Sequence, residues 1–226
     1  TATSGVVSQA LSFIVFVILA RLMAPADYGL IALSMAVILI LIAASRLGLE
    51  KLLVQLDTVG ATEADTAFFF SLLLGSLLSA LLWLAAPSLA GLVDTPELQP
   101  VMRALAPVVF LKALEVVPLG LMIRELNFKV VAMRTLVALF AGGIAGIAMA
   151  LKGYGVWALV SQEIVKAVCS LIALWLACEW RPGFSTSARA GRKMLAVSAH
   201  IMGSEMTRIA QNHLDLYQKD GWLFLV

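Results

Sequence analysis

The sequence predicts an all-α membrane protein, a polytopic bundle of transmembrane helices. Hydrophobic residues make up 62% of the 226 residues and charged residues only 13%, and the mean hydropathy is +0.98. A soluble domain carries about half apolar and about a quarter charged residues, because it must cover its core with polar side chains. Apolar runs of about 20 residues match the length that a helix needs to cross the hydrocarbon of a bilayer, and they are too long for barrel strands.

Short polar or turn-forming segments separate these runs. Residues 25–29 turn the chain between the first two runs, and residues 57–65 and 94–97 form polar breaks. Residues 152–155 read as a tight hairpin, and residues 180–183 open a basic linker. We therefore expect six spans and the beginning of a seventh, at residues 4–20, 29–45, 66–86, 104–122, 130–151, 156–178 and 194–210.

The loops between the expected spans are short, so neighbouring spans should pair as antiparallel hairpins. Gly142 and Gly146, with Gly143 beside them, lie in the fifth span. Small residues at this spacing allow helices to approach each other closely in lipid. We interpret them as packing positions rather than as a binding motif.

Lysine and arginine are unevenly shared between the two sets of loops. The loops after spans two, four and six hold most of them, namely Arg46, Lys51, Arg124, Lys129, Arg134, Arg181, Arg189, Arg192 and Lys193. The loops after spans one, three and five hold Arg21, Arg103 and Lys152. Because cytoplasmic loops carry the excess of basic residues, the N-terminus and the first set of loops are expected in the cytoplasm.

Three pairs of opposite charge lie inside the expected spans at the same spacing of three residues. They are Lys112 with Glu115, Glu163 with Lys166, and Glu205 with Arg208. This spacing places both members of a pair on one face of a helix, and a charge inside the bilayer is costly enough that such faces should avoid lipid. Each pair could merely fix helix packing, or the three together could line one polar, partly cationic cavity suited to an anionic cargo. Pro107 and Pro118 could bend the fourth span.

Other classes of protein find no support in the sequence. It contains no Walker loop, dinucleotide-binding glycine motif, zinc-protease motif or nucleophile elbow, so we do not expect an enzyme. Cys169 and Cys178 are nine helical residues apart, about 13 Å, which is beyond disulfide reach. His200 and His213 have no carboxylate or cysteine at ligand spacing. We expect no metal or other cofactor and, with a net charge of only +2, no nucleic-acid partner.

Three short motifs carry a family resemblance. Residues 20–30 (ARLMAPADYGL) are similar to the "ARLL-P-(D/E)-(F/Y)-G" turn of Wzx or RfbX-like oligosaccharide flippases. Residues 124–129 (RELNFK) resemble the "R-E-L-x-F-K" loop of that family, and residues 153–160 (GYGVWALV) with Gln162 resemble its entry to span six. The chain thus looks like a polysaccharide transporter of the multidrug/oligosaccharidyl-lipid/polysaccharide exporter superfamily.

The resemblance implies an architecture of two six-helix lobes around a central cavity with alternating access. Residues 1–178 would form the N-terminal six-helix transmembrane lobe, residues 179–193 a basic cytoplasmic linker, and residues 194–226 the start of a truncated second lobe. We expect the chain to begin inside its first span and to depart from the family pattern after Asp215.

The resemblance also implies a function. Members flip undecaprenyl-pyrophosphate-linked oligosaccharide from the cytoplasmic to the periplasmic leaflet of the bacterial inner membrane, so the expected partners are this lipid-linked oligosaccharide, membrane lipids, and polysaccharide polymerase or assembly proteins. From their positions inside the membrane, we expect cations to attract the pyrophosphate and carboxylates to tune them or to accept coupling protons. The cations are Lys112, Arg134, Lys166 and Arg208, and the carboxylates are Glu115, Glu163 and Glu205.

Three alternatives remain open at this point. A multidrug exporter of the same superfamily would favour a net acidic cavity over mixed pairs. A membrane enzyme of polysaccharide assembly, such as a polymerase or ligase, would need a large periplasmic loop. A structural membrane subunit would keep its charge pairs dry and mutually satisfied.

Overall fold

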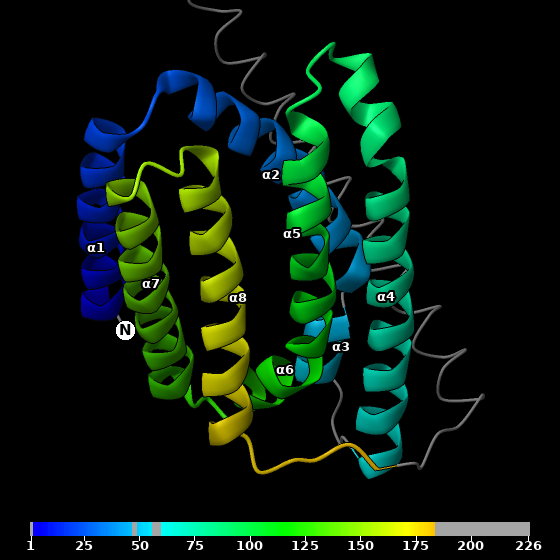
Figure 1. Cartoon of the computed structure of the whole chain (residues 1–226). Helices are drawn as coiled ribbons and strands as arrows, with labels where there is room; N and C mark the ends of the chain where they lie inside the picture. The colour runs from blue at the N-terminus through cyan, green and yellow to red at the C-terminus, as the bar shows by residue number, and fades with distance from the viewer. Residues whose placement is uncertain (1, 47–48, 56–59, 184–226) are drawn as a thin grey trace, which may run out of the picture.

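The computed structural model describes residues 2–46, 49–55 and 60–183, and every regular element within them is a helix (Figure 1). The helices are α1 (Ala2–Leu22), α2 (Pro25–Arg46), α3 (Leu49–Gln55), α4 (Ala61–Leu92), α5 (Leu98–Leu114), α6 (Val116–Arg124), α7 (Phe128–Leu151) and α8 (Val156–Ala177). The predicted all-α fold class is confirmed.

Six helical segments of the described chain are long and apolar enough to cross a membrane. Five of them are α1, α2, α4, α7 and α8, and the sixth is Leu98–Arg124, which combines α5 and α6. These segments coincide with the six complete spans that the sequence predicts. The seventh span, at 194–210, and most of the linker lie outside the described residues, so the division of the chain into lobes stays a prediction.

Helix boundaries differ from the sequence-based prediction in several places. The turn expected at residues 25–29 is wrong, because α2 begins at Pro25 and the chain turns at residues 23–24. The third span was expected at 66–86, whereas α4 runs from Ala61 to Leu92 over 32 residues, because a helix continues into the polar layer on both sides of the hydrocarbon. The short helix α3 was not predicted at all. Its Leu49 and Leu53, one turn apart, are both buried, and a Cβ on Gly120 of α6 would meet Leu53, so α3 packs as an amphipathic helix.

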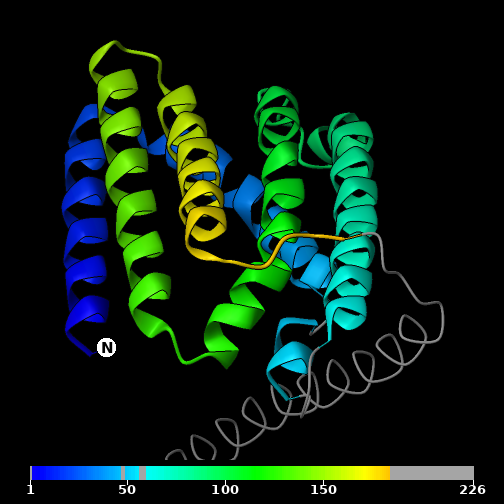
Figure 2. The same cartoon turned by 90° about the horizontal axis from the view of Figure 1, so that it is seen from below.

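The helices form a row with one helix crossing it. Figures 1 and 2 show α1, α7, α8, α5 and α4 side by side, with α2 running obliquely across them. The hairpins α4–α5 and α7–α8 pack along their lengths as predicted. The first predicted hairpin is wrong, because α1 packs mainly against α7 rather than against α2. The hydrophobic pattern of α1 does not indicate whether α2 or α7 is its neighbour, because both are apolar.

Glycines of α7 explain both of its close contacts. A Cβ on Gly142 would collide with the side chain of Lys166 on α8, and a Cβ on Gly146 would lie 3.1 Å from Cβ of Gln162. A Cβ on Gly143 would lie 2.7 Å from Val15 Cγ2 on α1. The predicted role of these glycines as packing positions is therefore confirmed.

The hairpin between α7 and α8 also depends on glycine. Gly153 has φ +76° and Gly155 has φ +54°, a region of backbone conformation that residues with a Cβ rarely adopt. The turn at 152–155 is therefore the tight hairpin that the sequence predicts.

The bundle core is built from aliphatic side chains of four helices. Ile38 of α2, Leu82 of α4, Leu105 of α5 and Val160 of α8 belong to one buried cluster. Large apolar side chains also lie on the outside, as expected for a surface that faces lipid. They include Phe13, Leu73, Leu84, Phe140 and Leu176, each more than half exposed.

Candidate functional site

A buried carboxylate lies where the fourth span is interrupted. Glu115 separates α5 from α6, and its side chain is only 1% exposed. Its Oε1 accepts a hydrogen bond from Lys112 Nζ at 2.9 Å, and its Oε2 accepts one from Arg134 Nη1 at 2.8 Å. One carboxylate therefore connects a cation of α5 with a cation of α7. We call these three residues the Glu115 triad.

Proline explains why the helix breaks at this place. Pro118 has no N–H to donate to the carbonyl of Leu114, and its ring crowds that carbonyl. The hydrogen-bond ladder of α6 restarts when Leu119 N donates to Glu115 O at 2.9 Å. Figure 1 shows α6 turning away from the axis of α5. Pro107 lies inside α5 without ending it, so of the two predicted kink sites only Pro118 coincides with a break.

The charges of the triad do not cancel. One anionic and two cationic groups leave a net positive charge, and Arg46 at the end of α2 lies close enough to act electrostatically on Lys112. Arg46 is itself paired with Glu50 at 3.3 Å. The Nε atoms of Arg46 and Arg134 are buried and have no hydrogen-bond partner in the described part of the chain. The cluster therefore keeps positive charge and unused donors, which an anion could accept.

A second ion pair lies on α8. Lys166 Nζ is 2.6 Å from Glu163 Oε1, and the two side chains are 26% and 22% exposed. Both line a cavity of about 250 Å³ bounded by α1, α2, α7 and α8. The hydroxyl of Tyr28 and Oε1 of Gln162, which line the same cavity, are buried without a hydrogen-bond partner among the described residues. The cavity therefore places an ion pair and two polar atoms with free hydrogen-bonding capacity in a largely apolar wall.

The structure brings together five of the seven site residues that the sequence singles out. They form two groups, the Glu115 triad and the Glu163–Lys166 pair. Two of the three predicted pairs with a spacing of three residues form. Glu205 and Arg208 lie outside the described residues. The contact between Glu115 and Arg134 was missed, because the two residues belong to different helices and no spacing rule connects them.

The six spans and their internal ion pairs define a multi-pass membrane protein. The polysaccharide biosynthesis protein family matches residues 18–217, and the chain belongs to this family. It is similar to the succinoglycan biosynthesis transport protein ExoT of Rhizobium meliloti (strain 1021), with 26% identity over 196 residues. The alignment covers 87% of this chain and 40% of the relative, so the chain spans less than half of that protein's length. No solved structure matches the chain.

These comparisons confirm the resemblance to polysaccharide transporters that the sequence motifs carry. The matched region includes all three motifs. The name of this relative refers to transport rather than to an enzymatic reaction.

Proposed function

We propose that the protein acts in flipping undecaprenyl-pyrophosphate-linked oligosaccharide from the cytoplasmic to the periplasmic leaflet of the bacterial inner membrane. The observation that supports this proposal most strongly is the Glu115 triad, which has an excess of positive charge inside a membrane span. A pyrophosphate cannot cross hydrocarbon unless cations replace its water. No covalent bond is made or broken in this step, so the residues are needed only to bind and to release.

The orientation that the basic residues favour gives the triad a place in this process. Arg46 and Arg124 lie at the ends of α2 and α6, and the positive-inside rule assigns these ends to the cytoplasm. Arg134 is six residues from the start of α7, about 9 Å into the membrane from that side. On this assignment the N-terminus is cytoplasmic, and the triad lies in the cytoplasmic half, where the substrate enters.

Glu115 has a separate role in this proposal. It holds Lys112 and Arg134 side by side, which limits the cost of keeping two like charges in a low-dielectric site. An arriving pyrophosphate would compete with Glu115 for the same two cations. Binding and release would then differ by an exchange of partners rather than by the full cost of exposing bare charges.

The alternatives fit this arrangement less well. A multidrug exporter for cations would favour a net acidic site, whereas the triad is net cationic. A polymerase or ligase would need a large loop with acidic catalytic residues. In the described part of the chain, the loops between spans on the side away from the basic residues are 23–24, 93–97 and 152–155.

The test is the leaflet distribution of lipid-linked oligosaccharide in cells that carry the full-length gene. Lys112→Gln and Arg134→Gln should each cause the substrate to accumulate in the cytoplasmic leaflet, while Lys112→Arg should keep substantial activity. Lys129→Gln is the matched control, because Lys129 is an exposed cation at the same end of α7. Membrane levels of each variant are measured in parallel. Wild-type distribution in both Gln variants at normal levels would refute the proposal.

A further inference from the structure

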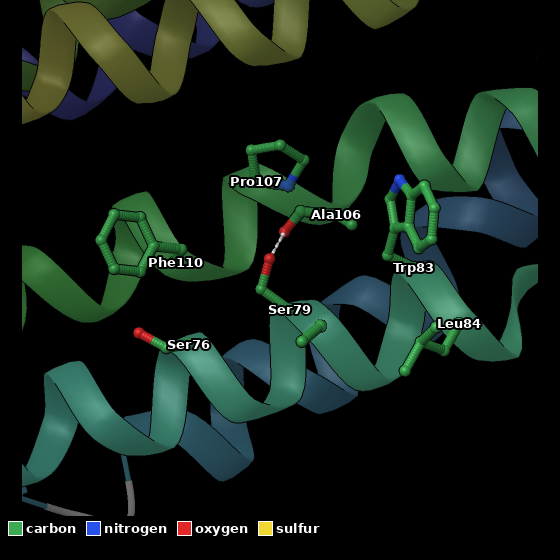
Figure 3. A pocket seen from close by; sticks show the side chains of 8 residues that line it. Ser76, Ser79, Trp83, Leu84, Ala106, Pro107 and Phe110 are labelled. Carbon is green, nitrogen blue, oxygen red and sulfur yellow. Dashed lines mark hydrogen bonds between the residues drawn. The ribbon is translucent and has the colours of Figure 1, made fainter.

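A groove runs between α4 and α5, away from the charged residues described above. It has a volume of about 510 Å³ and is lined by the following residues, seven of which are labelled in Figure 3: Ser76, Ser79, Ala80, Trp83, Leu84, Ala106, Pro107 and Phe110. Trp83 is 49% and Leu84 66% exposed, so the groove opens to the outside of the described bundle. The walls are largely apolar. The hydroxyl of Ser79, one of the two serines in the lining, already donates to Ala106 O at 2.8 Å.

The two helices themselves close one end of the groove. A Cβ on Gly75 of α4 would collide with Cβ of Ala113 on α5, so the helices touch there. The groove begins at the next residue of α4, Ser76, and continues beside Pro107 and Phe110 of α5. From Ser76 to Leu84 the groove covers nine residues of α4, a rise of about 12 Å along its axis.

A cation lies at the other end of the groove. The guanidinium carbon of Arg103 is 4.6 Å from the centre of the Trp83 ring, and Arg103 Nε donates to Trp83 O at 3.4 Å. These contacts fix the guanidinium plane beside the groove. Its two terminal nitrogens donate to no protein oxygen in the described part of the chain. Arg103 is five residues into α5, about 7.5 Å from its start, a depth from which an arginine side chain reaches the headgroup layer.

We propose that this groove binds one acyl chain of an anionic phospholipid, whose headgroup phosphate pairs with Arg103. Both walls belong to membrane-spanning helices, so an open apolar groove between them is filled by hydrocarbon. The free nitrogens of Arg103 supply the charge that a phosphate requires. A groove about 12 Å long accommodates part of one acyl chain rather than a long polyprenyl tail. The proposal uses no residue of the proposed transport site.

The test measures lipid contact at Trp83 in reconstituted vesicles of the full-length protein. Phosphatidylglycerol or phosphatidylcholine with brominated acyl chains is titrated into the vesicles, and tryptophan fluorescence is recorded. The contribution of Trp83 is the difference between wild type and Trp83→Phe. We expect brominated phosphatidylglycerol to quench Trp83 with an apparent affinity about fivefold higher than brominated phosphatidylcholine.

Two variants separate the charge from the groove. Arg103→Gln should abolish the preference for phosphatidylglycerol over phosphatidylcholine. Arg21→Gln should leave this preference unchanged, although Arg21 lies at the end of α1 on the same side of the membrane. Ala80→Phe should displace the chain and weaken the quenching by both lipids, and Ala80 is exposed, so this change does not overpack the core. Equal quenching by both lipids in wild type, or no quenching of Trp83 by either lipid, would overturn the proposal.

Discussion

Removing the charge of Arg134 should measurably destabilise the bundle. Its Nη1 is 2.8 Å from Glu115 Oε2, and the two side chains are only 14% and 1% exposed. In Arg134→Gln, Glu115 keeps Lys112 but loses one of its two charged donors. A hydrogen bond to a charged group contributes about 1.5–3 kcal/mol, and an uncompensated buried charge costs more. Because Lys112 remains, we expect a loss of about 2–3 kcal/mol in the free energy of unfolding.

The assay is unfolding in mixed micelles, in which sodium dodecyl sulfate is titrated against a mild detergent and helicity is followed by circular dichroism. Lys129→Gln serves as the control, because this exposed cation has no ion pair within the described residues and should change stability by less than about 0.5 kcal/mol. The double variant Glu115→Gln/Arg134→Gln completes a thermodynamic cycle. Residues in direct contact should show a coupling free energy of about 0.5–3 kcal/mol. A coupling indistinguishable from zero would refute the assignment of the triad as one unit.

Three further predictions concern packing, hydrogen bonding and thiol reactivity. Gly142→Leu should force α7 away from Lys166 and lower the free energy of unfolding by about 1–3 kcal/mol in the same micelle titration; stability equal to wild type would mean that the two helices do not touch there. Tyr28→Phe should be neutral within about 0.5 kcal/mol or slightly stabilising, because the buried hydroxyl has no hydrogen-bond partner among the described residues; a clear loss of stability would reveal a partner. Burial raises the pKa of the Cys178 thiol, so less thiolate is present at a given pH. In a Cys169→Ser background, maleimide should therefore label Cys178 slowly at neutral pH. The labelling rate should continue to rise at pH values above the ordinary thiol pKa of about 8.5. Labelling at neutral pH as fast as that of a free thiol would contradict this assignment.

The spans were predictable because the bilayer imposes a simple physical condition on them. A segment that crosses hydrocarbon must be long, apolar and helical, and each of these properties can be read from a local window of sequence. The glycines of α7 were predictable for a similar reason, since the spacing of Gly142 and Gly146 is a property of a single helix. The hairpin at 152–155 follows from glycines that tolerate positive φ.

The remaining features depend on contacts between segments. Nothing local in α1 distinguishes α7 from α2 as its neighbour, because both present apolar faces. Glu115 and Arg134 are 19 residues apart in sequence, and their contact exists only because the break near Pro118 brings α6 back toward α7. The only local signal was the intramembrane position of Arg134, which implied that it needed a partner without naming Glu115.

Transbilayer movement of the lipid-linked sugar tests the central claim most directly. The full-length protein is reconstituted into vesicles with a fluorescent undecaprenyl-pyrophosphate-linked sugar, and the fraction accessible to an external quencher is followed over time for wild type, Lys112→Gln and Lys129→Gln. We expect wild type and Lys129→Gln to accelerate the movement and Lys112→Gln to be at least about tenfold slower, since a tenfold change corresponds to about 1.4 kcal/mol of lost interaction. Equal rates for Lys112→Gln and wild type would contradict a role of the Glu115 triad in moving the pyrophosphate.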